Sequence, residues 1–228
     1  MGMSPYITPH HKKRNRAVRI EALRSLILLT VFISVIFLAS FFYPVITLPK
    51  APDFDVLPEI EKPDIMSDPV QIGLSPTHRF AMKNYEIHAV AAYAVTARIL
   101  GIRYYQFDRP SRISPVDFAL GWKHMSQDDV LQDINISQSG RFYYWRTRNK
   151  TISERAIITS SANTHIIPAD REIWRQLRRL KKNDTVTLRG YLVNVSGRYG
   201  FRWNTSLTRA DQGDGACEIL YVMEVIKH

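Results

Sequence analysis

Ser160, Ser161, Asn163, His165 and Asp170 place hydroxyls, an imidazole and a carboxylate within eleven consecutive residues. A nucleophilic hydrolase needs these groups, because a base takes the hydroxyl proton and a third group orients that base. Ser161 or Ser160 is therefore a candidate nucleophile, with His165 as base and Asp170 as the orienting carboxylate. No G-x-S-x-G motif surrounds either serine. The alternative is that these polar side chains bond backbone groups in a turn before a helix that begins at Asp170.

A second polar segment, residues 202–211, alternates polar groups with few large hydrophobic ones. If this segment faces a groove, Trp203, Asn204 and Arg209 are positioned to contact a sugar or a peptide. The alternative is a structural ion pair at a turn, formed by Arg209 and Asp211. The segment is therefore a candidate binding strand.

A third candidate is the basic face of a helix predicted over residues 170–182, after the sequence Pro-Ala-Asp. Apolar residues recur along one face of this helix, and arginines occupy the rest. Arg175, Arg178 and Arg179 are the candidate contacts for lipid headgroups, an anionic polysaccharide or an acidic partner. The alternative is a solvated face without a ligand.

Metal and cofactor sites are not predicted. The histidines at positions 78, 88, 124, 165 and 228 are widely spaced and form no H-x-x-x-H or H-E-x-x-H motif. The single cysteine, Cys217, excludes both an internal disulfide and a cysteine-rich zinc site. No glycine-rich loop of the phosphate-binding kind is present.

An uncharged stretch begins at Ser25 and ends at Leu48. About 20 apolar residues in a helix span a hydrocarbon core of about 30 Å. Six basic residues and one acid precede Leu48, and these account for half of the formal net charge of +10. Since cations stay on the cytoplasmic side, we expect a cytoplasmic tail over 1–24, a single-pass anchor in the bilayer over 25–48, and an exported remainder. A cleaved signal peptide is the competing interpretation, but its apolar region would be shorter.

Six prolines with intervening acids predict an extended stalk over residues 49–77, followed by an exported globular domain over 78–228. The apolar segment 81–105 favours a strand over a helix, and 140–148 is an aromatic strand candidate. Ser114, followed by Pro115, predicts the start of a helix, and Ser126 predicts another.

The C-terminal third predicts β structure, with a bulge at Gly190, a hairpin loop over 196–200 and a last strand over 217–226. The sequence as a whole therefore predicts an α+β protein. Its N-terminal transmembrane helix precedes a β-rich domain with a few short helices, resembling a small, partly open barrel of the OB or SH3 type.

Five short segments of the sequence carry a resemblance to known proteins: SPVDFALGW, SQSGRFYYW, SANTHIIPAD, LRGYLVNV and LTRADQGDGACEILYV. With these segments the chain resembles an uncharacterised family of bacterial membrane-anchored proteins, over most of the chain after the stalk. The resemblance implies a bacterial inner membrane and periplasm, and it implies no activity.

These observations favour a non-enzymatic, membrane-tethered periplasmic module that binds another envelope component, either a protein or a glycan. Nucleic acid is not an expected partner of an exported domain. Two alternatives stay open: an envelope hydrolase that uses Ser161 and His165, and a structural subunit of a membrane complex.

Overall fold

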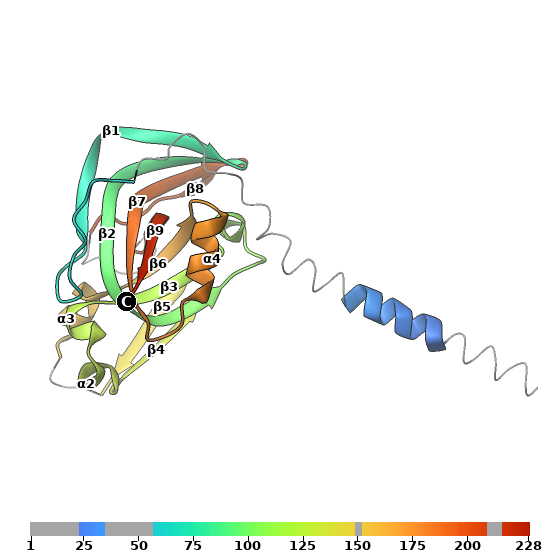
Figure 1. Ribbon diagram of the computed structural model, residues 1–228, viewed down its shortest axis with the longest axis horizontal. Coiled ribbons are helices and arrows are strands. Elements are labelled where there is room, and N and C mark those ends of the chain that lie inside the picture. The colour runs from blue at the N-terminus through green and yellow to red at the C-terminus, as the bar shows by residue number, and fades with distance from the viewer. Residues whose placement is uncertain (1–22, 35–56, 149–151, 209–215) are drawn as a thin grey trace, which may run out of the picture. The chain divides into compact units, whose positions relative to one another are not determined.

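The computed structural model describes residues 23–34, 57–148, 152–208 and 216–228 (Figure 1). The chain divides into two units, Met1–Thr47 and Leu48–His228. In the first unit, residues 23–34 are helical and their large apolar side chains are exposed. Among the residues described, no helix has both the length and the apolar character needed to cross a membrane. Residues 35–48 of the predicted anchor lie outside the described ranges, so the anchor stays a prediction.

The second unit is built on five strands that close into a ring, in the order β2-β3-β6-β9-β7 and back to β2. Their bounds are β2 Tyr85–Tyr104, β3 Val116–Gly121, β6 Ser161–Pro168, β7 Thr185–Gly197 and β9 Glu218–Lys227. β2 pairs with β7 from Tyr85 to Arg98 and with β3 from Arg98 to Tyr104, which closes the ring. All of these pairings are antiparallel except the one between β6 and β9.

Further strands extend this barrel at its edges. β1, Val70–Met82, pairs with the outer side of β2, and β8, Phe201–Trp203, pairs with the end of β7. A separate hairpin joins β4, Ile134–Ser139, to β5, Phe142–Thr147. The helical elements are η1 Pro110–Arg112, η2 Lys123–Ser126, α2 Asp128–Leu131, α3 Glu154–Thr159 and α4 Arg171–Arg179.

Buried apolar side chains fill the barrel from all five of its strands. β2 is buried without interruption from Ala91 to Ala97, where β7 pairs with one of its edges and β1 pairs with the first part of the other. A smaller apolar cluster under the β4–β5 hairpin includes Leu100, Met125 and Ile157. The hairpin is therefore packed against the outside of the barrel, over the strands β3 and β6.

The α+β class is confirmed. Strands lie where they are predicted over 81–105 and 140–148, and the predicted helix over 170–182 is α4. The short helix predicted at Ser126 is present as α2. The helix predicted to begin at Ser114 is wrong, because the residues that follow form β3, which is buried along its whole length.

The stalk predicted over residues 49–77 is corrected in its second half. Ile60 is buried, the carbonyl of Pro58 accepts a hydrogen bond from Arg189, and β1 begins at Val70. Residues 57–77 therefore belong to the domain, and the predicted boundary at residue 77 lies inside β1. Residues 49–56 lie outside the described ranges.

Candidate functional site

The proposed nucleophile and base of a hydrolase lie on the same strand, β6, but apart from each other. Four residues separate Ser161 from His165, which corresponds to about 13 Å along a strand. The Ser161 hydroxyl donates to the carbonyl of Ile157 at 2.7 Å and accepts from Tyr143 at 3.0 Å. Burial raises the pKa of Tyr143 to about 12, so this phenol stays a donor. Ser160 is buried at the end of α3. The structure therefore does not bring these serines to His165.

Asp170 does not orient His165 either. Its carboxylate accepts a hydrogen bond from the backbone N–H of Ile173 at 2.8 Å and caps the N-terminus of α4. The polar run before it is not a turn, as the alternative interpretation predicted, because residues Ser161–Pro168 form the buried strand β6.

The carboxylate beside His165 is that of Asp117, which lies directly opposite on β3. Nδ1 of His165 lies 2.9 Å from Oδ1 of Asp117 without forming a hydrogen bond to it. The Trp203 ring lies against His165 with centroids 4.7 Å apart. Asp117 is fully buried, so its charge needs partners inside the protein.

Arg141, in the turn of the β4–β5 hairpin, supplies the main partner. Its guanidinium contacts Asp117 at 2.8 Å and holds both oxygens of Asp108, at 2.7 and 3.0 Å. It also donates to the Ser114 carbonyl at 2.9 Å and stacks on the Tyr105 ring at 3.9 Å. Burial alone would raise the pKa of Asp108, but the hydrogen bonds and charge of Arg141 outweigh it, and the pKa is lowered.

Asn163 extends this network toward the hairpin. It donates to the carbonyl of Arg141 at 3.1 Å and accepts from Gln138 at 2.8 Å. We call the residues Asp108, Asp117, Arg141, Asn163 and His165 the Arg141 cluster. The cluster fastens the hairpin and the loop after β2 to the barrel, which is a structural role.

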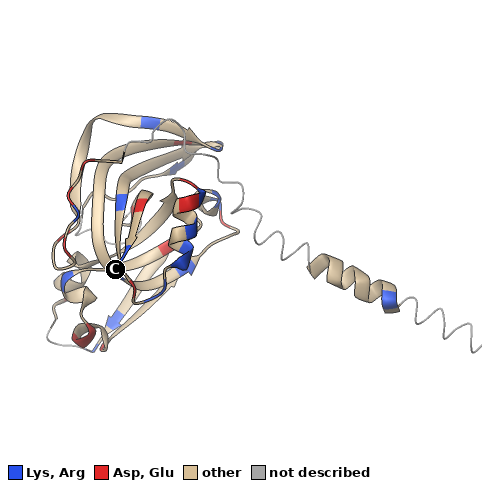
Figure 2. Cartoon of the chain, viewed as in Figure 1, with Lys and Arg blue, Asp and Glu red and all other residues tan. Residues whose placement is uncertain are grey.

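The predicted binding residues fall in different places. Trp203 is half-buried against His165, and its ring lies 5.7 Å from the Arg141 guanidinium, whereas Asn204 is exposed. Arg209 lies outside the described ranges. Arg175, Arg178 and Arg179 are exposed on α4, where Arg175 pairs with Glu172. Figure 2 shows several basic positions along this helix. The structure does not join the candidate strand and the basic helix into one site.

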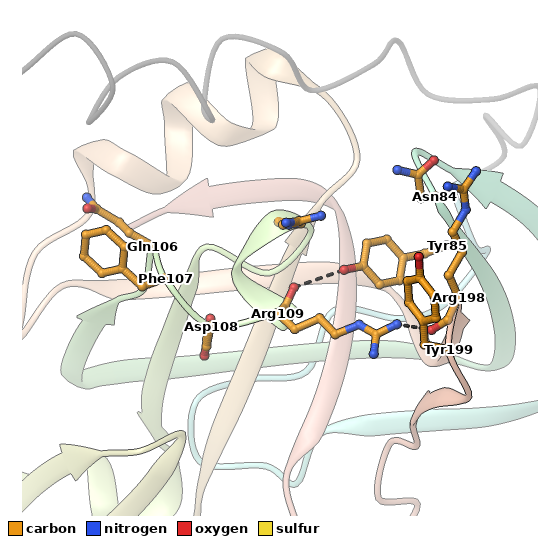
Figure 3. Close-up of a pocket in the computed structure, with 9 residues that line it drawn as sticks. Asn84, Tyr85, Gln106, Phe107, Asp108, Arg109, Arg198 and Tyr199 are labelled. Atoms are coloured by element: carbon orange, nitrogen blue, oxygen red, sulfur yellow. Dashed lines mark hydrogen bonds between the residues drawn. The ribbon is translucent and has the colours of Figure 1, made fainter. Parts of the chain in front are cut away.

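A pocket of about 700 Å³ lies where three connections of the barrel meet: the β1–β2 turn, the loop 105–115 and the turn 198–200 (Figure 3). It is lined by Asn84, Tyr85, Gln106, Phe107, Asp108, Arg109, Arg112, Arg198 and Tyr199. Two of these side chains are almost entirely in solvent, since Phe107 is 90% exposed and Tyr199 is 94% exposed. We call this site the loop pocket.

Two hydrogen bonds join the segments that line the loop pocket. Arg109 donates to the carbonyl of Arg198 and lies 4.7 Å from the Phe201 ring, while the Tyr85 hydroxyl donates to the Arg109 carbonyl at 3.0 Å. Asp108, which Arg141 holds, is the member of the Arg141 cluster that lines the pocket.

The charge of the loop pocket is positive. Arg109, Arg112 and Arg198 line it, and its one lining carboxylate, Asp108, is already paired with Arg141. Within the ranges that the structure describes, no acidic side chain pairs with the guanidinium of Arg112 or Arg198. The pocket can therefore accept an anion at its cations and a flat ring at its exposed aromatic side chains.

Sequence reasoning missed most of this pocket. The loop over 196–200 was predicted, but Tyr199 in it was not singled out. Phe107 and Arg109 lie between the strand predicted over 81–105 and the helix predicted at Ser114, in a segment for which nothing was predicted. The sequence did contain one signal for this pocket, a large aromatic residue at the tip of a polar loop, in Arg198-Tyr199-Gly200.

Comparison with protein-family models, with curated proteins and with solved structures finds no match to this chain. The resemblance to a family of bacterial membrane-anchored proteins therefore stays a prediction.

Proposed function

We propose that the chain is a membrane-tethered periplasmic module that binds a glycan of the bacterial cell envelope at the loop pocket. The observation that carries the proposal is the pair of almost fully exposed aromatic side chains, Phe107 and Tyr199, at one cationic pocket. Exposed aromatic rings that packing does not require are typical of binding sites, because the flat face of a sugar ring packs well against them.

The arrangement of the barrel supports the proposal. We infer a barrel of the OB type from the ring order, from the single parallel pair β6–β9 and from the position of α4 between the third and fourth barrel strands. OB barrels bind oligosaccharides and oligonucleotides with the loops after their first and fourth strands. Here these loops are 105–115 and the segment after β7, the same two that form the loop pocket. The fold alone carries no function, so the exposed side chains decide the site.

The β4–β5 hairpin gives a reason why the ligand would use the loops and not the strand face. In an OB barrel the second and third strands present the other common binding surface. In this chain those strands are β3 and β6, and the hairpin covers them through Arg141 and Gln138. A glycan is favoured over a nucleic acid because the uncharged stretch 25–48 predicts export of the domain.

The membrane orientation is tested with reporters fused after His228. We expect alkaline phosphatase at that position to be active and a fluorescent protein that folds only in the cytoplasm to be dark, because the cations of the tail stay inside. We also expect the intact chain to require detergent for extraction. The reverse pattern of the two reporters would overturn the tethered, periplasmic part of the proposal.

Binding is tested with the full-length chain in detergent micelles, by co-sedimentation with isolated cell-wall sacculi and by competition with soluble fragments of the same glycan. Phe107→Ala and Tyr199→Ala should each weaken binding about tenfold, because each removes an apolar contact worth about 1.5 kcal/mol. Tyr144→Ala is the matched control, since Tyr144 is an exposed tyrosine of β5 that does not line the pocket.

Equal binding by the two pocket variants and the control would show that the loop pocket is not the site. Preferential binding of a single-stranded oligonucleotide over the glycan fragments would replace the glycan with a nucleic acid as the ligand. A failure of wild-type protein to bind sacculi or their fragments would overturn the proposed ligand.

A further inference from the structure

Two cationic side chains meet beside the loop pocket. Lys83 lies in the turn between β1 and β2, where its backbone has a positive φ of 55°, and its ammonium group donates to the carbonyl of Arg112 at 2.6 Å. Arg112 itself lines the pocket, and so does Asn84, the residue after Lys83. The hydrogen bond therefore holds the ammonium group of Lys83 at the backbone of Arg112, a residue whose side chain lines the pocket.

The two charges repel each other. Lys83 is an exposed residue, but partial burial of its ammonium group lowers the pKa of Lys83. The charge of Arg112 lowers it further. In the part of the chain that the structure describes, neither residue is paired with a carboxylate, and Asp108 is held by Arg141. Like charges kept together without a counter-ion destabilise a protein, and a bound anion would relieve the repulsion.

We propose that Lys83 and Arg112 form an oxyanion-binding subsite of the loop pocket, which takes a phosphate or carboxylate group of the ligand. The identity of that ligand as a glycan rests on the proposed function, whereas the anion subsite does not. Arginine binds such groups with two parallel N–H donors, and lysine adds a compact charge with N–H donors beyond the one bonded to the Arg112 carbonyl. Arg198 lies across the same pocket and adds to the positive field.

The subsite is tested through the reactivity of Lys83 in the full-length chain. Only the uncharged amine reacts with an acylating reagent, so a bound oxyanion, which favours the ammonium form, should slow acylation of Lys83. We expect protection by inorganic phosphate, measured by mass spectrometry, relative to chloride at the same ionic strength. Lys182, an exposed lysine after α4 that does not line the pocket, serves as the internal control. Acetate in place of phosphate distinguishes a carboxylate from a phosphate as the preferred group.

Arg112→Ala should raise the phosphate concentration for half-protection about tenfold, because a charge-assisted hydrogen bond is lost. Arg146→Ala, at an exposed arginine of β5, should leave that concentration unchanged. Protection by either phosphate or acetate supports the subsite. The absence of protection by both, or equal behaviour of the two arginine variants, would overturn it.

The same experiment separates the subsite from the proposed function. Phe107→Ala should weaken binding to sacculi while phosphate still protects Lys83, because that side chain carries no charge. Phosphate protection in a protein that binds no sacculi would support the anion subsite and overturn the proposal that the ligand is a glycan. Binding to sacculi without phosphate protection would retain the glycan and overturn the subsite.

Discussion

Replacing Arg141 with alanine should lower the free energy of unfolding by about 3–5 kcal/mol, because the buried carboxylate of Asp117 loses its ion-pair partner. Asp117 is fully buried and contacts the Arg141 guanidinium at 2.8 Å. Removal of the guanidinium also frees Asp108, which loses both of its hydrogen bonds to Arg141. The measurement is urea denaturation of the full-length chain in detergent micelles, followed by tryptophan fluorescence.

Arg146→Ala is the control for this change, because Arg146 lies on the same hairpin but is exposed. It should change the free energy of unfolding by no more than about 0.5 kcal/mol. The double variant Arg141→Met with Asp117→Leu should recover part of the lost stability, since a buried ion pair is often replaceable by apolar residues. Equal losses for Arg141→Ala and Arg146→Ala would mean that the cluster does not hold the hairpin.

A second effect of Arg141→Ala should appear at the loop pocket. Asp108 lines the pocket and follows Phe107, and Arg141 holds its carboxylate, so the loop 105–115 loses one of its attachments. The attachments that remain join Arg109 to the Arg198 carbonyl, Tyr85 to the Arg109 carbonyl and Lys83 to the Arg112 carbonyl. Release of Asp108 also adds an unpaired negative charge to a cationic site. Affinity for an anion should therefore fall even where the variant stays folded.

The elements that sequence reasoning predicted are those in which local preference and tertiary packing agree. α4 has an Asp170 cap, an apolar face and basic residues in its last turn, and each of these signals acts within about ten residues. The apolar run of β2 is buried, and β2 pairs with β7 along one edge and with β1 and then β3 along the other. The β-branched and aromatic residues around that run indicated the strand.

The prediction of a helix at Ser114 is wrong because the local preference for a helix start is weaker than the tertiary pairing and burial of the residues that follow. Ser114 and Pro115 provide a helix start, but the next six residues pair with both β2 and β6 and are buried along their length. The Ser114 carbonyl instead accepts a hydrogen bond from the Arg141 guanidinium. A barrel strand with both neighbours in place gains more from burial and pairing than a short helix gains from its cap.

The candidate site could not be assembled from the sequence because its residues come from distant segments. Asp117 and Arg141 are 24 residues apart, and the loop pocket brings Tyr85 and Arg109 to Arg198 only after the ring of strands has closed. The nearby group Ser161, His165 and Asp170 looked like a triad because it was compact in sequence. On a strand, residues that are close in sequence lie about 3.3 Å apart for each residue between them, so their side chains do not meet.

Gly190→Ala should prevent closure of the barrel or lower the free energy of unfolding by about 3 kcal/mol or more. Gly190 lies at the bulge in the pairing of β7 with β9, where the register shifts after Arg189. A Cβ added there would overlap the backbone oxygen of Tyr221 and lie 3.0 Å from its carbonyl carbon. These are backbone atoms of a strand paired on both sides, so they can move away only if β9 separates from β7 or β6.

Gly73→Ala is the matched control, because Gly73 is also a strand glycine but a Cβ added there meets no atom within 4 Å. The control should fold with nearly unchanged stability, since β1 lies on the outer side of β2 and does not close the ring. Circular dichroism and urea denaturation of both variants provide the comparison. Equal stability of the two would mean that β7 and β9 are not in close backbone contact at Gly190. A large loss confined to Gly190→Ala would tie the stability of the domain, and with it the loop pocket that closure assembles, to this one contact.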